Sequence, residues 1–227
     1  MCGRFTLIHD IKSIAQAFQV PVPATMQIQP RYNAAPAQNI VTLMQNKDEE
    51  EPHLDMVRWG LVPSWAKDES IGNRMINARA ETLAEKPSFK RLLHNKRCLI
   101  VADGFYEWKS EPGAKTKTPM YFTLEDDELF TFAGLWDTWR NPEGEQIRTC
   151  TIITTNPNTL VSPVHNRMPT ILPAEALEEW LNPRHQDEQA LLHLLSPYDA
   201  TDMKVRSVSR LVNNTNNDSP EILEILV

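Results

Sequence analysis

The sequence predicts an α+β fold in a single domain, and three observations lead to this class. Apolar runs typical of strands outnumber the helical patterns, and most of them follow one another along the chain. Helical patterns are inserted only near the start, in the middle and late in the chain. The 227 residues, 41% of them hydrophobic, suit one sizeable core, and no repeat or obvious linker divides them. We therefore expect one domain over residues 1–227.

The individual elements follow from local patterns. Segment 9–20 has apolar residues at helical spacing behind Asp10, a suitable N-cap, and predicts the first helix. Residues 21–38 contain four prolines and must be extended or turning. The other expected helices are 80–94, 173–181 and 187–195, and the expected strands are 40–44, 56–62, 98–108, 119–124, 129–136, 149–155 and 203–212.

Charge and hydropathy narrow the function classes. No apolar run approaches the roughly 20 residues that span a bilayer, and the N-terminus lacks a signal-peptide pattern, so we expect a cytoplasmic protein without a membrane partner. The net charge of −7 argues against nucleic-acid binding by bulk electrostatics. Much of the acid is clustered at 47–55 and 125–128, however, which leaves a basic face possible elsewhere.

The three cysteines form neither a disulfide framework nor a zinc ribbon by their spacing, and no metal or organic cofactor is implied. Cys98 and Cys150 lie in apolar runs and are expected to be small buried hydrophobes. Cys2 lies in no such run. Once Met1 is removed, the α-amine of Cys2 becomes free beside its own thiol, so that one residue carries two nucleophiles.

Polar residues interrupt two of the strand-like segments. Asn77, Arg79 and Glu81 alternate with apolar residues and share one face of an extended chain, which fits a solvated strand face as well as a site. Glu107 stands between two aromatic residues. If they desolvate its carboxyl group, its pKa rises and it can exchange protons near neutral pH, although a surface glutamate on an edge strand is an equal alternative.

Two further residues are candidates for a site. His165 lies between Pro163 and Pro169, which restrict the backbone, and it is the best catalytic candidate among the six histidines. No HExxH spacing for a metal is present. Most of the six tryptophans are expected in the core, but an exposed tryptophan in the loop that carries Trp59 and Trp65 would be able to stack on an unpaired base.

Six ordered motifs then resemble one family. They are "MCGRF" at the start, "RYNAAP" (31–36), "WGLVPSW" (59–65), "INARAET" (76–82), "ADGFYEWK" (102–109) and "HNRMP" (165–169). Together they are similar to the SOS-response-associated peptidase (SRAP) family, whose members crosslink to abasic sites in DNA. The resemblance implies a compact, barrel-like, mainly antiparallel β core with peripheral helices.

The resemblance also implies roles for four catalytic residues. Cys2 captures the aldehyde of an opened abasic sugar through its α-amine and thiol, which gives a thiazolidine. Asn77 holds the amine, Glu107 shuttles protons during Schiff-base formation, and His165 lies near the sugar hydroxyl. Closing the ring within one residue is entropically cheap because the second nucleophile is already in place.

The implied partner is single-stranded DNA that contains abasic sites, including junctions with duplex, in the DNA damage response. Arg4, Arg79 and Arg167 are the expected phosphate contacts, since arginine forks onto phosphate oxygens. Pro36 and Trp65 are expected to shape the strand channel. We expect a monomer that covalently protects the lesion.

Two other functions stay open at this stage. Cys2, His165 and Asn77 could form a cysteine-type peptidase, a hydrolase activity that includes removal of Met1. A non-enzymatic module for gapped or junction DNA is the third reading. Thiazolidine chemistry requires an N-terminal cysteine, whereas a peptidase nucleophile works anywhere in a chain, so the position of Cys2 favours crosslinking.

Overall fold

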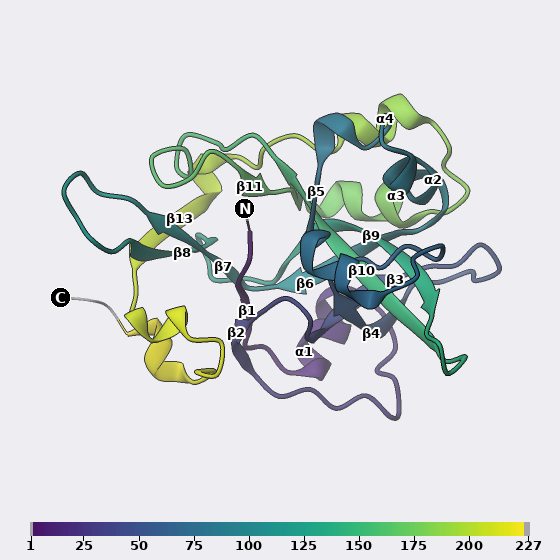
Figure 1. Cartoon of the computed structure of the whole chain (residues 1–227), viewed down its shortest axis with the longest axis horizontal. Helices are drawn as coiled ribbons and strands as arrows, with labels where there is room; N and C mark the ends of the chain where they lie inside the picture. Colours follow the sequence, from purple (N-terminus) through teal and green to yellow (C-terminus); the bar gives the residue numbers. More distant parts are fainter. Residues whose placement is uncertain (1, 225–227) are drawn as a thin grey trace.

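The computed structural model describes residues 2–224, and in this part of the chain two β-sheets organise the fold (Figure 1). One sheet has the strand order β13-β8-β7-β1-β2, and the other has the order β11-β10-β4-β3-β6-β9-β12. Helices lie around these sheets, so the predicted α+β class is confirmed. No helix within residues 2–224 is long and apolar enough to cross a membrane.

The larger sheet closes into a five-stranded barrel because β9 and β10 also pair with each other. Its strands are β3 (Asn39–Met44), β4 (His53–Trp59), β10 (Gln146–Thr155), β9 (Phe130–Arg140) and β6 (Arg97–Ala102). Four of the five neighbour pairs are antiparallel, and only β4 and β10 run parallel. Closure leaves the ring without free edges. The barrel-like, mainly antiparallel core implied by the sequence is therefore confirmed.

The smaller sheet is antiparallel throughout and lies beside the barrel (Figure 1). It contains β2 (Arg31–Ala34), β1 (Phe5–Leu7), β7 (Gly104–Lys109), β8 (Thr118–Leu124) and β13 (Met203–Ser207). Three short strands extend the barrel sheet: β5 (Asn77–Arg79), β11 (Met168–Pro169) and β12 (Ile171–Leu172).

The expected single strand over 98–108 is wrong, since the chain turns at Asp103 and passes from the barrel into the smaller sheet. The buried Asp103 carboxylate accepts hydrogen bonds from Thr6 Oγ1 and from the backbone N–H of Ile8, each at 2.5 Å. At Gly104, a Cβ atom would lie 2.2 Å from Tyr121 Oη. The turn therefore needs a short acceptor followed by glycine, which is what "ADGF" supplies.

Two other expected strands end earlier than the patterns suggested, and the first of them also begins three residues earlier, at His53. The strand expected over 56–62 ends at Trp59, because Gly60 has a φ of 125° that an L side chain rarely adopts. The strand expected over 203–212 ends at Ser207 and is followed by a 3-10 turn. The other expected strands occur in place, although β9 and β10 are longer than expected.

An α-helix occurs in each expected helical segment, although the segments 80–94 and 173–181 begin with 3-10 turns and become α-helical only at Pro87 and Leu177. Asp10 caps α1 (Ile11–Ala17) by accepting from the Ser13 backbone N–H at 2.8 Å. The other α-helices are α2 (Pro87–Asn95), α3 (Leu177–Leu181) and α4 (Glu188–His193). The 3-10 segments are η1 (Glu69–Arg74), η2 (Ala80–Thr82), η3 (Ala174–Ala176), η4 (Ala200–Asp202), η5 (Arg210–Asn213) and η6 (Pro220–Leu223).

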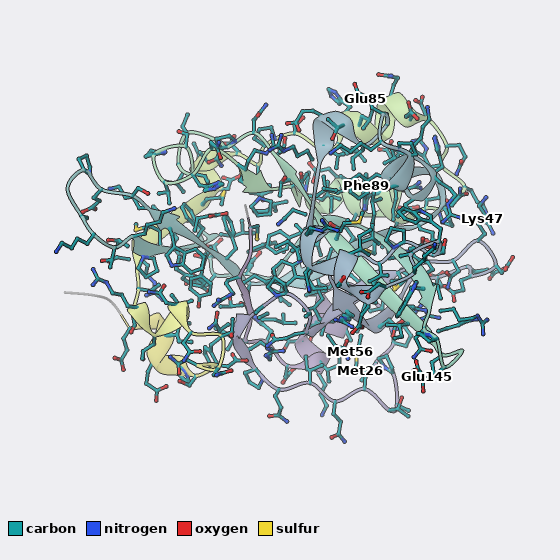
Figure 2. The ribbon with its side chains drawn as sticks, viewed as in Figure 1. Met26, Lys47, Met56, Glu85, Phe89 and Glu145 are labelled. Atoms are coloured by element: carbon teal, nitrogen blue, oxygen red, sulfur yellow. The ribbon has the colours of Figure 1, made fainter. Side chains whose placement is uncertain are left out.

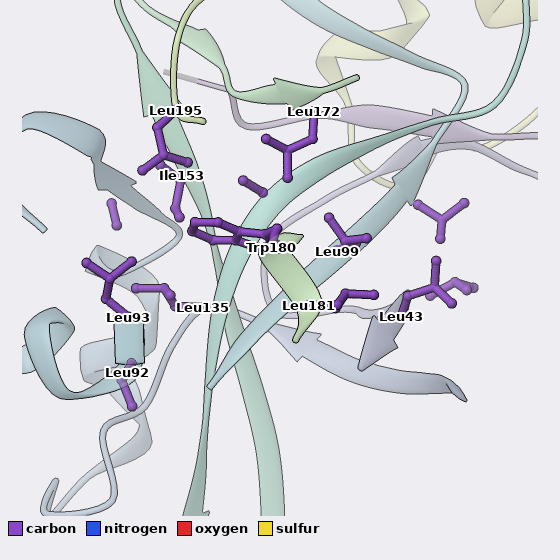
Figure 3. Close-up of a cluster of buried hydrophobic side chains, with 14 of the residues drawn as sticks. Leu43, Leu92, Leu93, Leu99, Leu135, Ile153, Leu172, Trp180, Leu181 and Leu195 are labelled. Atoms are coloured by element: carbon purple, nitrogen blue, oxygen red, sulfur yellow. The ribbon is translucent and has the colours of Figure 1, made fainter. Parts of the chain in front are cut away.

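Two large groups of buried apolar side chains stabilise this arrangement. One packs leucines from the barrel and from α2 around Trp180 of α3, whose indole N–H donates to the Cys98 carbonyl at 3.0 Å (Figure 3). Phe89 joins this group from α2, where its position is labelled in Figure 2. The other group contains Cys2 with several aromatic rings. Cys98 and Cys150 are fully buried, as predicted.

Candidate functional site

The N-terminal segment is held in place by pairing with β7. Phe5 and Thr6 of β1 pair with Phe105 and Gly104, and the Tyr106 N–H donates to the Arg4 carbonyl at 3.0 Å, which extends the ladder toward the N-terminus. The Phe5 ring packs against Trp59 and Phe132, with centroid distances of 5.3 and 5.8 Å. The antiparallel register therefore carries Cys2 along β7 toward the segment that contains Glu107.

Cys2 is buried, and Asn77 contacts it directly. The Asn77 Nδ2 group donates to the Cys2 carbonyl at 2.9 Å. Asn77 Oδ1 is also buried, and no hydrogen-bond partner for it is found among the described residues. Burial, followed by the negative charge of Glu107, raises the pKa of the Cys2 thiol, while the Arg4 backbone N–H opposes the shift.

Glu107 is a buried carboxyl group at the same place. Its side chain is 3% exposed, and this burial raises its pKa above the ordinary value. Electrostatic interactions with the His165 and Lys117 side chains oppose the shift, so both side chains lie within electrostatic reach of the carboxylate. The alternative of a solvated glutamate on a strand surface is therefore wrong.

His165 lies in the segment that precedes β11. Its Nδ1 atom is 3.1 Å from both the backbone N and the carbonyl O of Arg167, and the Arg167 N–H donates to it. The His165 backbone N–H donates to the Val161 carbonyl at 3.0 Å. With Nδ1 accepting, the neutral imidazole carries its hydrogen on Nε2. The backbone thus fixes the ring orientation, as the flanking prolines suggested.

The structure brings together all four side chains that the resemblance marked as catalytic. They come from the segment before β1, from β5, from β7 and from the segment before β11. The Asn77 hydrogen bond connects Asn77 to Cys2, and the electrostatic interactions of Glu107 with Cys2 and with His165 connect the other groups. Their catalytic roles stay predictions.

Arg4 is engaged within the protein. Its Nη1 donates to Asn33 Oδ1 at 2.9 Å and to the Val212 carbonyl at 2.6 Å, and its guanidinium lies 5.9 Å from the centroid of the Trp108 ring. Burial lowers its pKa from the ordinary value. Arg4 therefore connects the N-terminal segment to η5, and its role as a phosphate contact stays a prediction.

The other two predicted phosphate ligands lie at one end of β5 and β10. Arg79 is exposed and pairs in register with Thr154. Arg167 donates to both carboxylate oxygens of Glu81, at 2.6 and 2.9 Å. Arg79 therefore presents its charge to solvent, whereas Arg167 is paired.

The two predicted channel residues lie on loops next to the end of β4. Trp65 is 63% exposed and belongs to a loop that is fixed by the Trp139 indole N–H, which donates to the Ala66 carbonyl at 2.7 Å. Pro36 is half-buried and follows β2, in a turn whose next N–H donates to the Trp59 carbonyl at 2.8 Å. The Trp65 ring is therefore accessible, and its role in the strand channel stays a prediction.

Sequence reasoning missed two residues that shape this site. Asn33 is fully buried, accepts from Arg4, and donates through Nδ2 to the Asn217 carbonyl at 2.8 Å. Its only signal was its place in "RYNAAP". Lys117, which acts on the Glu107 carboxylate, gave no signal because it stands in a polar stretch between two strands. Within residues 2–224, no cluster of three or more His, Cys, Asp or Glu residues that could hold a metal is found.

Comparison with known proteins identifies the class to which this fold and site belong. Residues 1–215 match the family model described as SOS response associated peptidase (SRAP), and the chain belongs to this family.

Among curated relatives, the abasic site processing protein YoqW of Bacillus subtilis (strain 168) is 52% identical over 227 residues, with 99% of each chain covered. The abasic site processing protein HMCES of Gallus gallus is 36% identical over 222 residues, which cover 86% of this chain and 66% of that protein. A crystal structure of a protein from Bacteroides thetaiotaomicron matches over 100% of both chains with a TM-score of 0.88 and 27% identity. A phage-related protein from Bordetella bronchiseptica matches with a TM-score of 0.73 and 28% identity, over 92% of this chain and 95% of the other.

Proposed function

We propose that this chain processes abasic sites in DNA by capturing the opened sugar covalently on Cys2, after Met1 has been removed. One observation carries the proposal: three distant segments bring Asn77, Glu107 and His165 to Cys2, at the start of the chain. The relatives named abasic site processing proteins support the same assignment.

The first step is attack of the Cys2 α-amine on the aldehyde carbon. A carbinolamine forms and loses one water molecule to give an imine. Asn77 suits the task of holding the amine, because its Nδ2 already anchors the Cys2 carbonyl while its buried Oδ1 is able to accept an N–H bond. The reference pKa of an α-amine, about 7.7–8.0, leaves a useful neutral fraction at physiological pH.

Glu107 supplies the proton that the departing water needs. Its raised pKa keeps a larger fraction of the carboxyl group protonated near neutral pH than an exposed glutamate would keep. After dehydration, the Cys2 thiol adds to the imine carbon, and its proton passes through the Glu107 carboxylate to the nitrogen. The five-membered thiazolidine closes, and one water is lost overall.

His165 is placed to act on the sugar itself. The backbone of Arg167 occupies its Nδ1, so Nε2 is the atom that would face the sugar hydroxyl and exchange its proton during ring opening. The same exchange would assist reversal of the crosslink. These steps constitute a lyase-like Schiff-base activity.

The partner in this proposal is single-stranded DNA that contains an abasic site, including sites next to a duplex. An opened sugar must reach a buried thiol, which an unpaired nucleotide does more readily than a stacked pair. Arg79 offers an exposed charge for a phosphate, and the exposed Trp65 offers a face on which a base stacks.

A cysteine peptidase built from Cys2, His165 and Asn77 is the second candidate. It rests on the same proximity, but the surroundings of the thiol disfavour it. Peptidase cysteines work as thiolates in electropositive surroundings. Burial and the charge of Glu107 instead raise the pKa of the Cys2 thiol.

The test uses protein shown by intact mass to begin at Cys2, mixed with a single-stranded oligonucleotide that carries one abasic site. Wild type should give a heat-stable adduct on a denaturing gel without added reductant. Cys2→Ser keeps the amine and loses the thiol, so its adduct should survive only after borohydride reduction. Protein that retains Met1 is the matched control and should give no adduct. Absence of a stable adduct from processed wild type would refute crosslinking, and cleavage of peptide substrates would then support the peptidase.

A further inference from the structure

The guanidinium of Arg167, a predicted phosphate contact, is already paired with the Glu81 carboxylate. Arg167 Nη1 donates to Glu81 Oε1 at 2.6 Å and to Asn156 Oδ1 at 3.2 Å. Its Nη2 donates to Glu81 Oε2 at 2.9 Å and to the Thr154 carbonyl at 2.5 Å. The two Nη groups have four N–H bonds in all, and each has an acceptor. A phosphate can therefore bind these atoms only by replacing one of the acceptors.

Exposure indicates which acceptor would be replaced. The Arg167 side chain is 12% exposed and Thr154 is fully buried, whereas the Glu81 side chain is 44% exposed. Glu81 and Asn156, which is also exposed, are thus the ligands on the solvent side of the guanidinium, and Glu81 is the one that contacts both Nη atoms. Its two oxygens meet Nη1 and Nη2 side by side, which is also the geometry in which arginine grips two phosphate oxygens.

Replacing the Glu81 carboxylate by a phosphate requires no movement of the backbone at Arg167. Met168, the next residue, pairs with Thr155 in the β10–β11 ladder, and the Arg167 N–H is bonded to His165 Nδ1. The backbone is therefore fixed on both sides. Glu81 stands in η2, directly after β5, from which Arg79 presents its charge to the same region.

We propose that Glu81 is an internal counter-ion that occupies the phosphate-binding face of Arg167, and that a DNA phosphate must displace its carboxylate. This inference rests on the proposed function and adds a residue that limits the affinity for DNA. Arg79, Arg167 and Glu81 together carry a net charge of +1, and loss of the carboxylate changes it to +2. Undamaged single strands are therefore held more weakly than two arginines alone would hold them.

The test is Glu81→Gln in the processed full-length protein. An exposed ion pair is worth up to about 1 kcal/mol, so the variant should bind an undamaged single-stranded oligonucleotide roughly fivefold more tightly. The slope of log K against log salt should steepen by about 0.7, the contribution of one additional phosphate contact on single-stranded DNA.

The matched control is Glu85→Gln. Glu85 is exposed, lies four residues further along the same segment near the outer surface (Figure 2), and loses the same charge without touching Arg167. It should change binding less than twofold. In an Arg167→Gln background, Glu81→Gln should produce no gain, because the guanidinium that it releases is gone.

Equal or weaker binding by Glu81→Gln would overturn the proposal, as would an equal gain in Glu85→Gln or a gain that persists without Arg167. If thermal unfolding shows that Glu81→Gln is not folded, Glu81→Asp replaces it: the shorter side chain loosens the pair, and binding should tighten to a smaller degree. If wild type forms adducts but the Glu81 variants bind undamaged DNA no more tightly, the counter-ion role of Glu81 is refuted and the proposed function is not. A wild type that forms no adduct refutes the proposed function itself.

Discussion

The buried carboxyl group of Glu107 should speed adduct formation and destabilise the fold at neutral pH. Glu107→Gln separates these two effects. Its pKa is raised in the folded protein, mainly by burial. Between the unfolded value, near 4.5, and the higher folded value, the native state holds a proton that the unfolded chain has released. Stability of wild type therefore falls as the pH rises through this window.

Glutamine has a similar shape and cannot ionise, so the stability of the variant does not fall with rising pH for this reason. Below pH 4.5 the stabilities of the two proteins should be similar, and above it Glu107→Gln should become the more stable protein. Each tenfold change in the acid dissociation constant on folding changes the free energy of unfolding by about 1.4 kcal/mol. For a chain of this size, each kcal/mol shifts Tm by about 2–4 °C, and the Tm of Glu107→Gln at neutral pH should lie above that of wild type.

Adduct formation should change in the opposite direction. Removal of the proton donor should slow formation of the thiazolidine by about 100-fold or more at neutral pH. Urea denaturation at pH 4 and pH 7.5, with single-turnover gels at pH 7.5, measures both effects. Glu111→Gln is the matched control, since it removes a glutamate that is 52% exposed in the β7–β8 connection and should alter neither quantity. A variant that is less stable than wild type at pH 7.5, or one that reacts at the wild-type rate, would refute the reasoning.

Three other substitutions test the site and its support. Asn77→Asp replaces the Nδ2 donor, 2.9 Å from the Cys2 carbonyl, with an acceptor. It should slow adduct formation in gel assays by roughly 5- to 150-fold, the effect of about 1–3 kcal/mol, and an unchanged rate would argue against the role of Asn77. Trp65→Ala should weaken binding of single-stranded DNA by about 1–3 kcal/mol in fluorescence titrations. Because the Trp65 side chain is 63% exposed, the Tm of this variant should equal that of wild type. A large drop in Tm would show that the ring stabilises the fold. Gly104→Ala puts a Cβ 2.2 Å from Tyr121 Oη and should cost about 1–3 kcal/mol in denaturant titrations, whereas full stability would contradict the close approach.

Local patterns were sufficient for most of the elements. Helix α1 behind Asp10, the proline-rich stretch and the β-runs depend on neighbours within a few residues, which the sequence displays directly. The turn at Asp103 was missed, because four apolar residues before it and aromatic residues after it read as one strand. What breaks that strand is Thr6 and Ile8, which lie almost one hundred positions away.

For the candidate site, the sequence also indicated some features and not others. Ordered motifs marked Cys2, Asn77, Glu107 and His165, and the position of Cys2 by itself indicated chemistry that uses an amine with a thiol. The motifs also marked arginines, but they were unable to show that Arg4 and Arg167 already have partners inside the protein. Side-chain pairing depends on which segments the sheets bring together.

The sequence by itself determined the fold class, the burial of Cys98 and Cys150 and the family, since each depends on residue type, spacing or motif order. Only the tertiary structure decided that the barrel closes between β9 and β10, that Glu107 is buried, and that Glu81 occupies Arg167. Those outcomes come from contacts between distant parts of the chain. Desolvation and pairing of charges arise only when such parts meet, and no local pattern records them.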